Sequence, residues 1–151
     1  MSPKKKLFKN LVVIDSNFIL LPFQFKIDFF NDINSSLEGG TKFILFKQIF
    51  DELEAKKTRE PNSIKFQKQL KSGLLYLEKS KKKYDIIFKD DVKEKEETTD
   101  DFLLLKAIEL KKEGVNVFLA TNDQPFRRKL REALIGAIFL RQQKYLSIER
   151  S

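Results

Sequence analysis

The sequence predicts an α/β fold, a three-layer sandwich in which helices cover both faces of a mostly parallel five-stranded sheet. Two observations predict this class: five short apolar runs lie along the chain, and segments with helical spacing separate them. Alternation of strands and helices favours parallel pairing, because parallel strands need long crossover connections. Ligands of such open sheets bind beyond the carboxyl ends of the strands, so polar residues that follow a strand are candidate site residues.

The first predicted strand is the apolar run 11–14, whose continuous hydrophobicity is typical of a strand buried on both sheet faces. Helical spacing follows over residues 26–38 and ends at a pair of glycines. The remaining predicted elements are, in order, a strand at 43–46, helices at about 47–56 and 63–79, a strand at 85–88, a polar loop at 89–99, a helix at 102–112, a strand at 115–120, a helix at 125–133 and a strand at 137–140.

The chain has 151 residues, the size of one ordinary domain, and 41% of them are hydrophobic, which is enough for a core. We expect a single domain over residues 1–151, with short basic extensions at 1–10 and 142–151 and fraying around Lys4–Lys6. No apolar run approaches the roughly 20 residues that span a bilayer, and no signal-peptide pattern opens the chain. The expectation is a cytoplasmic protein without a membrane partner, and the absence of cysteine fits that compartment.

The residue types restrict the chemistry. The sequence has neither cysteine nor histidine, which excludes thiol nucleophiles, Ser-His triads and zinc sites of soft ligands. Carboxylates suit a hard cation such as Mg²⁺ or Mn²⁺. A net charge of +8 favours a polyanionic partner, either nucleic acid or an anionic membrane surface. The plainer alternative is a charge-rich surface that serves solubility or high temperature.

Acidic residues follow each of the first four predicted strands: Asp15, Glu52, the pair Asp100 and Asp101, and Asp123. The topology brings these acids toward one edge of the sheet. Each acid alone has a structural explanation, as a helix cap, a partner of a helix dipole or a member of an i,i+4 pair. Together they would hold one or two divalent ions, which activate water and stabilise a phosphoryl transition state.

Of the adjacent acids, Asp101 is preferred over Asp100 as the ligand. It shares a predicted helix face with the apolar residues Leu104, Leu105 and Ile108, so its carboxylate should point toward the interior. A buried acid needs a partner or a metal, because an unpaired buried charge is very costly.

Four short motifs in this order resemble those of the PIN-domain family. They are Val13–Asn17, Ile49–Leu53, Thr99–Leu103 and Ala120–Asp123. The tail from Leu130 to Arg141 is similar to single-domain archaeal PIN proteins, a group that includes VapC-type toxins and nucleases that process ribosomal RNA. The resemblance spans residues 11–141, nearly the whole chain.

The resemblance implies a metal-dependent endoribonuclease. Asp15, Glu52, Asp101 and Asp123 would be its catalytic residues and would hold one or two Mg²⁺ or Mn²⁺ ions, with Asp100 as the alternative ligand. Asn17 and Thr121 would orient the carboxylates or their waters. The alternative for this last pair is a role in turns or helix caps.

Basic residues near the last motif are the candidate RNA contacts: Arg127, Arg128, Lys129, Arg131, Arg141 and Lys144. A solvated helix face is the alternative reading of this cluster. RNA is the expected substrate, and a homodimer, an antitoxin protein and ribosome-assembly factors are candidate partners. The rival functions are a catalytically silent PIN-fold RNA-binding or assembly protein, a phosphatase or other Mg²⁺ enzyme on a similar fold, and a flap-type DNA nuclease.

Overall fold

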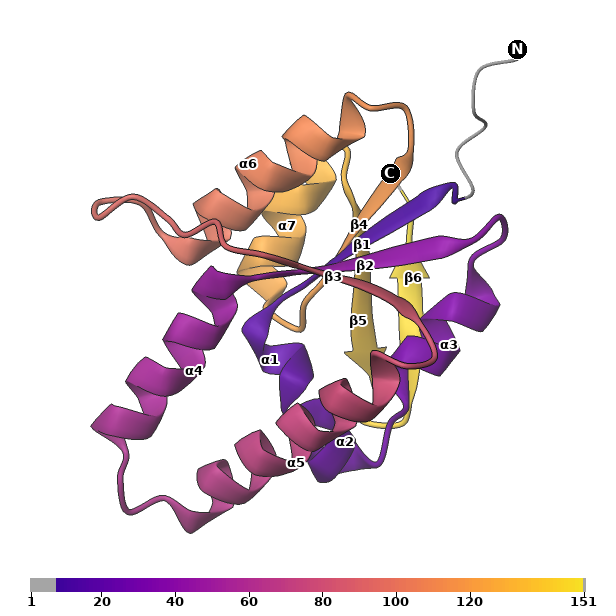
Figure 1. The fold of residues 1–151 in the computed structure, drawn as a ribbon. Coiled ribbons are helices and arrows are strands. Elements are labelled where there is room, and N and C mark those ends of the chain that lie inside the picture. Colours follow the sequence, from indigo (N-terminus) through magenta and orange to yellow (C-terminus); the bar gives the residue numbers. More distant parts are fainter. Residues whose placement is uncertain (1–7, 151) are drawn as a thin grey trace.

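A six-stranded sheet with the strand order β3-β2-β1-β4-β5-β6 forms the centre of the fold in the computed structural model, which describes residues 8–150 (Figure 1). The strands are β1 (Asn10–Ile14), β2 (Thr41–Phe46), β3 (Asp85–Lys89), β4 (Asn116–Ala120), β5 (Gly136–Arg141) and β6 (Tyr145–Glu149). All neighbouring strands are parallel except β5 and β6, which are antiparallel. The predicted α/β class with a mostly parallel sheet is therefore confirmed, whereas the predicted number of five strands is wrong.

Helices flank this sheet on both faces. They are α1 (Ser16–Ile19), α2 (Leu21–Phe25), α3 (Phe29–Ser36), α4 (Lys47–Arg59), α5 (Ile64–Ser80), α6 (Thr99–Lys111) and α7 (Gln124–Glu132). Phe43 and Phe46 are three residues apart on β2, so their side chains point to opposite faces. The ring of Phe43 packs on Phe30 of α3, and the ring of Phe46 packs on Phe102 of α6. Helices α3 and α6 therefore belong to different layers. Within residues 8–150, no helix is long and apolar enough to cross a membrane.

The sixth strand lies within residues 142–151, where the sequence predicted only an extension. The three residues Gln142, Gln143 and Lys144 connect β5 to β6, and both glutamines have positive φ angles, of 55° and 58°. Positive φ angles favour glycine and asparagine, so this pair of glutamines gave no turn signal. At the other end, Asn10 of the predicted extension 1–10 already belongs to β1, and Lys4–Lys6 lie outside the described residues.

The segment between β1 and β2 also differs from the prediction. Residues 16–25 form the short helices α1 and α2, which the sequence analysis did not predict. The predicted helix 26–38 is shorter, because Lys26 has a left-handed φ of 54° and Asp28 caps α3 by accepting a hydrogen bond from the Asn31 amide. Four- and five-residue helices are too short to show a periodic hydrophobic pattern.

The strand order reverses beside β1, which pairs with β2 on one side and β4 on the other. Such switch points leave a crevice at the carboxyl ends of the strands. Asp15 directly follows β1 there, and its amide donates a hydrogen bond to the carbonyl of Ala120 at the end of β4. The fold thus brings the residues after β1 and β4 together.

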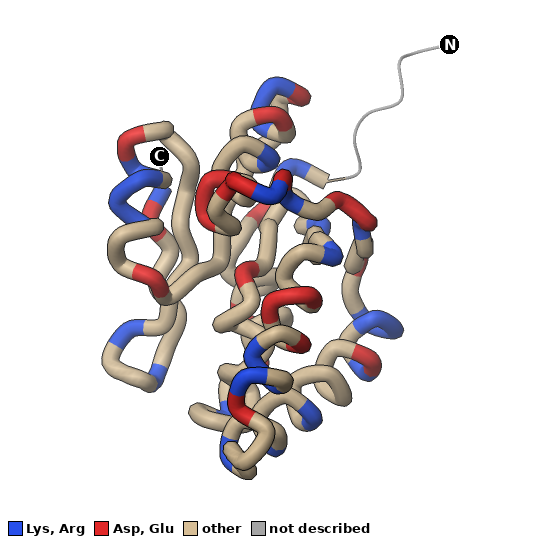
Figure 2. Tube along the Cα trace, turned by 90° about the vertical axis from the view of Figure 1, so that its left-hand side faces the viewer, with Lys and Arg blue, Asp and Glu red and all other residues tan. Residues whose placement is uncertain are grey.

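Charged residues are distributed widely over the molecule, whose net charge is +8. Figure 2 views the side of the fold that carries α4 and α6. On this side, acidic and basic positions are interspersed along the helices and loops. This side of the molecule is therefore not a uniform basic face.

Candidate active site

Asp15 is held at the end of β1 by neighbouring hydrogen-bond donors. The residue is only 5% exposed. One carboxylate oxygen accepts a hydrogen bond from the Ser16 amide at 2.7 Å, because Asp15 caps α1. The other oxygen accepts from the Thr121 hydroxyl at 2.8 Å and, more weakly, from the Asn17 side-chain amide at 3.4 Å. Both oxygens therefore have fixed positions.

The surroundings of Asp15 oppose its ionisation. Burial raises the pKa of this carboxyl from its ordinary value of 3.8 to about 6, against the lowering effect of the hydrogen bonds from Thr121 and Ser16. The negative charges of Asp100 and Glu52 raise the pKa further. Asp15 is thus an acid that nearby carboxylates repel, although these lie far from it in the sequence.

A polar network joins the end of β1 to the end of β4. The hydroxyl of the fully buried Thr121 donates to Asp15 and accepts a hydrogen bond from the Asp123 amide at 3.2 Å. The side-chain oxygen of Asn17 accepts from the Asn122 amide at 3.3 Å. The side-chain oxygen of Asn122 in turn accepts from the Leu140 amide at 2.9 Å. The structure therefore places Asn17 and Thr121 beside Asp15 and adds Asn122, which the sequence analysis missed between two predicted site residues.

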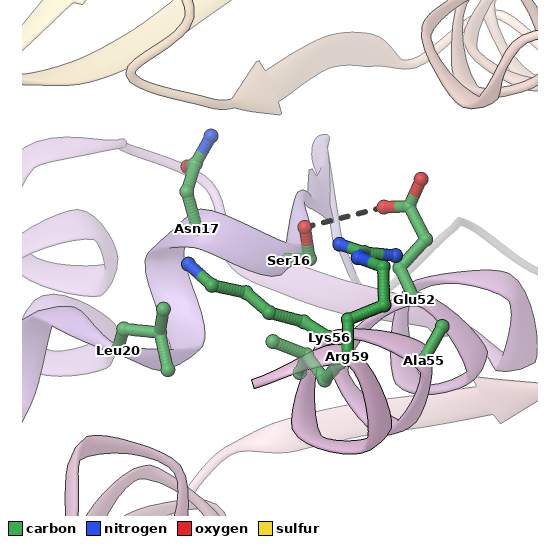
Figure 3. Close-up of a pocket in the computed structure, with 8 residues that line it drawn as sticks. Ser16, Asn17, Leu20, Glu52, Ala55, Lys56 and Arg59 are labelled. Atoms are coloured by element: carbon green, nitrogen blue, oxygen red, sulfur yellow. Dashed lines mark hydrogen bonds between the residues drawn. The ribbon is translucent and has the colours of Figure 1, made fainter. Parts of the chain in front are cut away.

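Glu52 faces the same region from α4. One of its carboxylate oxygens accepts a hydrogen bond from the Ser16 hydroxyl at 3.3 Å (Figure 3). Its other oxygen accepts from the hydroxyl of Thr99, at the start of α6. The sequence analysis missed Ser16 and Thr99 as site residues, although each directly adjoins a predicted acid. These contacts tie α4 to both α1 and α6.

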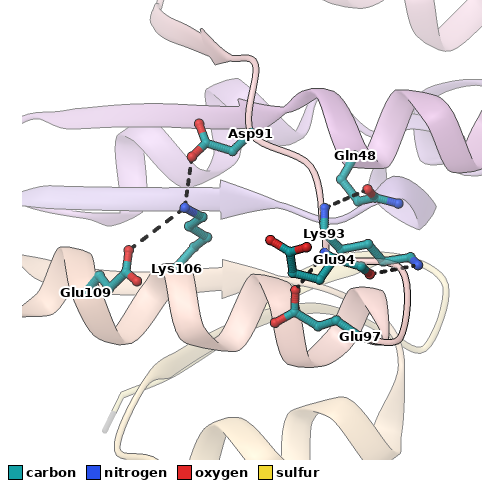
Figure 4. Close-up of polar contacts among 7 residues, drawn as sticks. All are labelled: Gln48, Asp91, Lys93, Glu94, Glu97, Lys106 and Glu109. Carbon is teal, nitrogen blue, oxygen red and sulfur yellow. Dashed lines mark hydrogen bonds and ion pairs between the residues drawn. The ribbon is translucent and has the colours of Figure 1, made fainter.

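The segment before α6 is anchored to helices α4 and α6, as Figure 4 shows. Residues 90–98 have no regular secondary structure apart from a turn, in agreement with the predicted polar loop. The side chain of the buried Gln48 accepts a hydrogen bond from the Lys93 amide at 3.0 Å, and Lys106 pairs with Asp91 at 2.8 Å. These contacts hold the chain that leads to the first turn of α6.

Asp100, rather than Asp101, lies among the other acids. Burial raises the pKa of Asp100, and the charges of Asp123 and Glu52 raise it further, while Lys129 lowers it. The side chain of Asp101 is 51% exposed and pairs with Lys129 at 3.3 Å. The prediction that Asp101 points inward is therefore wrong.

The physical reason is the orientation of α6. Its buried residues are Phe102, Leu103 and Ala107, whereas Leu105, on the face assumed to be internal, is 51% exposed. Asp100 lies three residues before Leu103 and so shares its face. A helix with apolar residues on several sides gives no unique inward direction from the sequence.

Asp123 completes the group after β4. It caps α7 by accepting a hydrogen bond from the Phe126 amide at 3.2 Å, and its charge acts on Asp100. Within residues 8–150, no three acidic side chains already lie close enough to one another to form a group that holds a metal ion. The fold thus brings Asp15, Glu52, Asp100 and Asp123 into one region with oxygen donors only, and the carboxylates of this region repel one another.

The predicted RNA-contact residues of the C-terminal part divide into different environments. Lys129 pairs with Asp101, and Arg131 pairs with Glu149 at 2.8 Å. The guanidinium of Arg127 lies 3.8 Å from the centre of the Phe139 ring, and that of Arg141 lies 5.3 Å from it. Arg128 and Lys144 are exposed. Arg127, Arg131 and Arg141 all act on the carboxylate of Glu149 and therefore lie near one another, whereas Lys129 acts on Asp100.

The sequence and the fold match a known class of protein. A family model described as the PIN-like domain matches residues 12–143, and the chain therefore belongs to the PIN-like domain family. It is 27% identical to Ribonuclease VapC4 of Methanocaldococcus jannaschii over 137 residues, which make up 91% of this chain and 95% of that protein. The solved structure of the PIN domain endonuclease Utp24 matches the fold with a TM-score of 0.65 at 22% identity, over 93% of this chain and 92% of the other.

Proposed function

We propose that this chain is an endoribonuclease that hydrolyses RNA phosphodiester bonds with Mg²⁺ or Mn²⁺ held by carboxylates. The observation that carries the proposal is the meeting of acids from four separate segments at the carboxyl end of a parallel sheet. Membership of the PIN-like domain family and similarity to a protein named as a ribonuclease support it.

The acids fit a hard divalent cation. Asp15, Glu52, Asp100 and Asp123 offer only oxygen ligands, which Mg²⁺ and Mn²⁺ prefer. The raised pKa values of Asp15 and Asp100 arise in part from neighbouring carboxylates, a repulsion that a cation would remove. One or two bound ions would supply a water of lowered pKa and neutralise charge on the phosphate. Asp101 is turned toward Lys129 and would not be a ligand.

Uncharged side chains would keep these carboxylates in place. Thr121 and the Ser16 amide hold the two oxygens of Asp15, and Asn17 supports both Asp15 and Thr121. The hydroxyls of Ser16 and Thr99 hold Glu52 in the same way. Groups at this distance from the reacting atoms orient the ligands that touch them, so their loss should reduce activity without removing the site.

Water attack on RNA in this site would leave a 5′-phosphate and a 3′-hydroxyl. Two cytoplasmic roles agree with such an activity, a toxin with an antitoxin partner and a nuclease of ribosomal RNA processing with ribosome-assembly factors as partners. A homodimer is a candidate assembly in either case. The genes next to this one would separate the two roles.

The second candidate is a catalytically silent PIN-fold protein that binds RNA. It is favoured by the finding that no three acids within residues 8–150 are yet arranged to hold a metal. Such a protein would bind RNA equally well with and without divalent ions and would not cleave it.

An RNA cleavage assay separates the two candidates. Purified protein should cut internally labelled single-stranded RNA at internal positions when Mn²⁺ or Mg²⁺ is present, and EDTA should stop the reaction reversibly. Cleavage that continues in EDTA, or binding of RNA without cleavage at any divalent-ion concentration, would contradict the proposed function.

A further inference from the structure

A pocket of about 320 Å³ opens beside Glu52, between α1 and α4 (Figure 3). Ser16 and Asn17 line it from α1, and Lys56 and Arg59 line it from α4. Figure 3 shows both basic side chains extending from α4 toward α1. The pocket therefore combines polar groups that contact the acidic cluster with two positive charges.

The spacing along α4 explains why these groups share one wall. Glu52, Lys56 and Arg59 are separated by four and then three residues, so they lie on one face of the helix. This spacing also suits an ion pair between Glu52 and Lys56, but the structure does not contain that pair. The carboxylate of Glu52 instead accepts hydrogen bonds from Ser16 and Thr99.

The two positive charges have no carboxylate partner. Within residues 8–150, neither Lys56 nor Arg59 takes part in an ion pair. The ammonium of Lys56 lies 4.8 Å from the centre of the Phe66 ring, which restricts its position without neutralising it. By contrast, Lys129 and Arg131 of α7 both pair with acids. Two uncompensated cations next to an acidic cluster are suited to a ligand that carries its own negative charge.

We propose that Lys56 and Arg59 each bind a backbone phosphate of the RNA next to the bond that is cleaved, and so align a single strand across the acids. This inference rests on the proposed function, because it takes RNA as the substrate. The planar guanidinium of Arg59 matches two phosphate oxygens at once, and the ammonium of Lys56 acts as a point charge. The RNA therefore enters along α4, past residues other than those predicted on α7.

The test is the salt dependence of RNA affinity. A single-stranded RNA of mixed sequence is titrated at several salt concentrations in EDTA, so that binding is measured without metal-dependent cleavage. The double variant Lys56→Gln/Arg59→Gln is compared with Lys57→Gln/Lys68→Gln, which removes two exposed lysines of α4 and α5 outside this pocket. Both variants lower the net charge by the same amount, so a difference between them reports position.

Each phosphate contact that is lost should reduce the slope of log affinity against log salt by roughly 0.7 for a single strand. We expect a reduction of about 1.4 for Lys56→Gln/Arg59→Gln and no change for the control variant. Arg59→Lys keeps the charge and should retain the slope while lowering the affinity. If the double variant loses its circular dichroism spectrum, each single variant should still reduce the slope by about 0.7.

Equal slopes for the pocket variant and the control would overturn the inference. If the unaltered protein cleaves RNA while these slopes are equal, only the role of Lys56 and Arg59 is wrong. If the unaltered protein neither binds nor cleaves RNA, the proposed function fails together with the inference.

Discussion

The carboxylate of Asp15 is buried and is repelled by two other acids. Together these effects lower the stability of the folded protein when Asp15 is ionised. Its hydrogen bonds from Ser16 and Thr121 compensate for burial only in part, because the pKa still lies at about 6. A carboxyl whose pKa is raised by folding keeps its proton longer in the native state than in the unfolded state. Its contribution to stability is therefore greatest below pH 4 and is lost as the pH rises through about 6.

The variant Asp15→Asn should therefore be more stable than the unaltered protein at high pH in EDTA. A pKa difference of about two units corresponds to a gain on the order of 2–3 kcal/mol at pH 8, and the gain should vanish near pH 4. Urea unfolding at pH 4, 6 and 8 measures it, with the half-exposed Asp101→Asn as the control that shows no comparable gain. If the Asp15→Asn protein were less stable than the original at pH 8, the hydrogen bonds to the Asp15 carboxylate would fully compensate for its burial, and the prediction would be wrong.

For single residues, the sequence predicted which acids belong to the site better than it predicted which way their side chains point. Asp15 follows β1 directly and Asp123 lies three residues after the end of β4, so the strand ends alone indicated the edge of the sheet at which they lie. The choice between Asp100 and Asp101 depended on the rotation of α6, which its apolar residues do not define. The hydroxyls of Ser16 and Thr99 were missed because a short polar side chain next to an acid has no distinctive sequence pattern.

The short helix α1 places the site residues Ser16 and Asn17, and its position depends on the longer helix α5. Gly73 lies near the middle of α5, and a Cβ atom added there would come within 1.9 Å of the carbonyl oxygen of Ile19. Ile19 ends α1, the helix that carries Ser16 and Asn17. Absence of a side chain at residue 73 therefore sets the distance between α1 and α5.

Substitution Gly73→Ala should destabilise the protein although alanine favours helices by about 1 kcal/mol over glycine. Forced separation of the two helices should outweigh that gain and leave a net loss of about 1–3 kcal/mol. The urea midpoint measures the change, and Ser72→Ala in the same helix is the control with little expected effect. A Gly73→Ala protein as stable as the original would show that α1 and α5 can move apart without cost.

At the scale of the elements, long helices and buried strands were predicted within a few residues, because α4, α5 and β4 each have a continuous pattern. The elements that were missed, α1, α2 and β6, are short or follow an atypical turn. Their positions come from tertiary contacts, such as the packing of α2 on α5 and the pairing of β6 with β5. Contacts of this kind leave no local pattern in the sequence.

Taken as a whole, the molecule supports its acids on a mostly parallel sheet, and acidic and basic residues are interspersed over the side that carries α4 and α6 (Figure 2). The α/β class with a mostly parallel sheet and the family membership follow from the strand pattern and the four motifs. The environment of the basic residues could not be predicted in this way. Lys129 pairs with Asp101 and Arg131 pairs with Glu149, and such ion pairs leave no pattern in a sequence. The acids therefore carry the central claim, and the adjacent pair in α6 offers the sharpest test of it.

The most direct measurement is the single-turnover rate of RNA cleavage in Mn²⁺ for Asp100→Asn and Asp101→Asn. These two variants change neighbouring residues in the same way, but only Asp100 lies among the acids after β1, β2 and β4. Loss of a metal-holding carboxylate should lower the rate by at least 100-fold, by analogy with other preorganised catalytic groups. We predict this loss for Asp100→Asn and for Asp15→Asn. For Asp101→Asn we predict a rate within about threefold of the original, because its ion pair with Lys129 is exposed and worth about 0–1 kcal/mol. The opposite order, or equal activity of Asp15→Asn and the unaltered protein, would contradict these predictions.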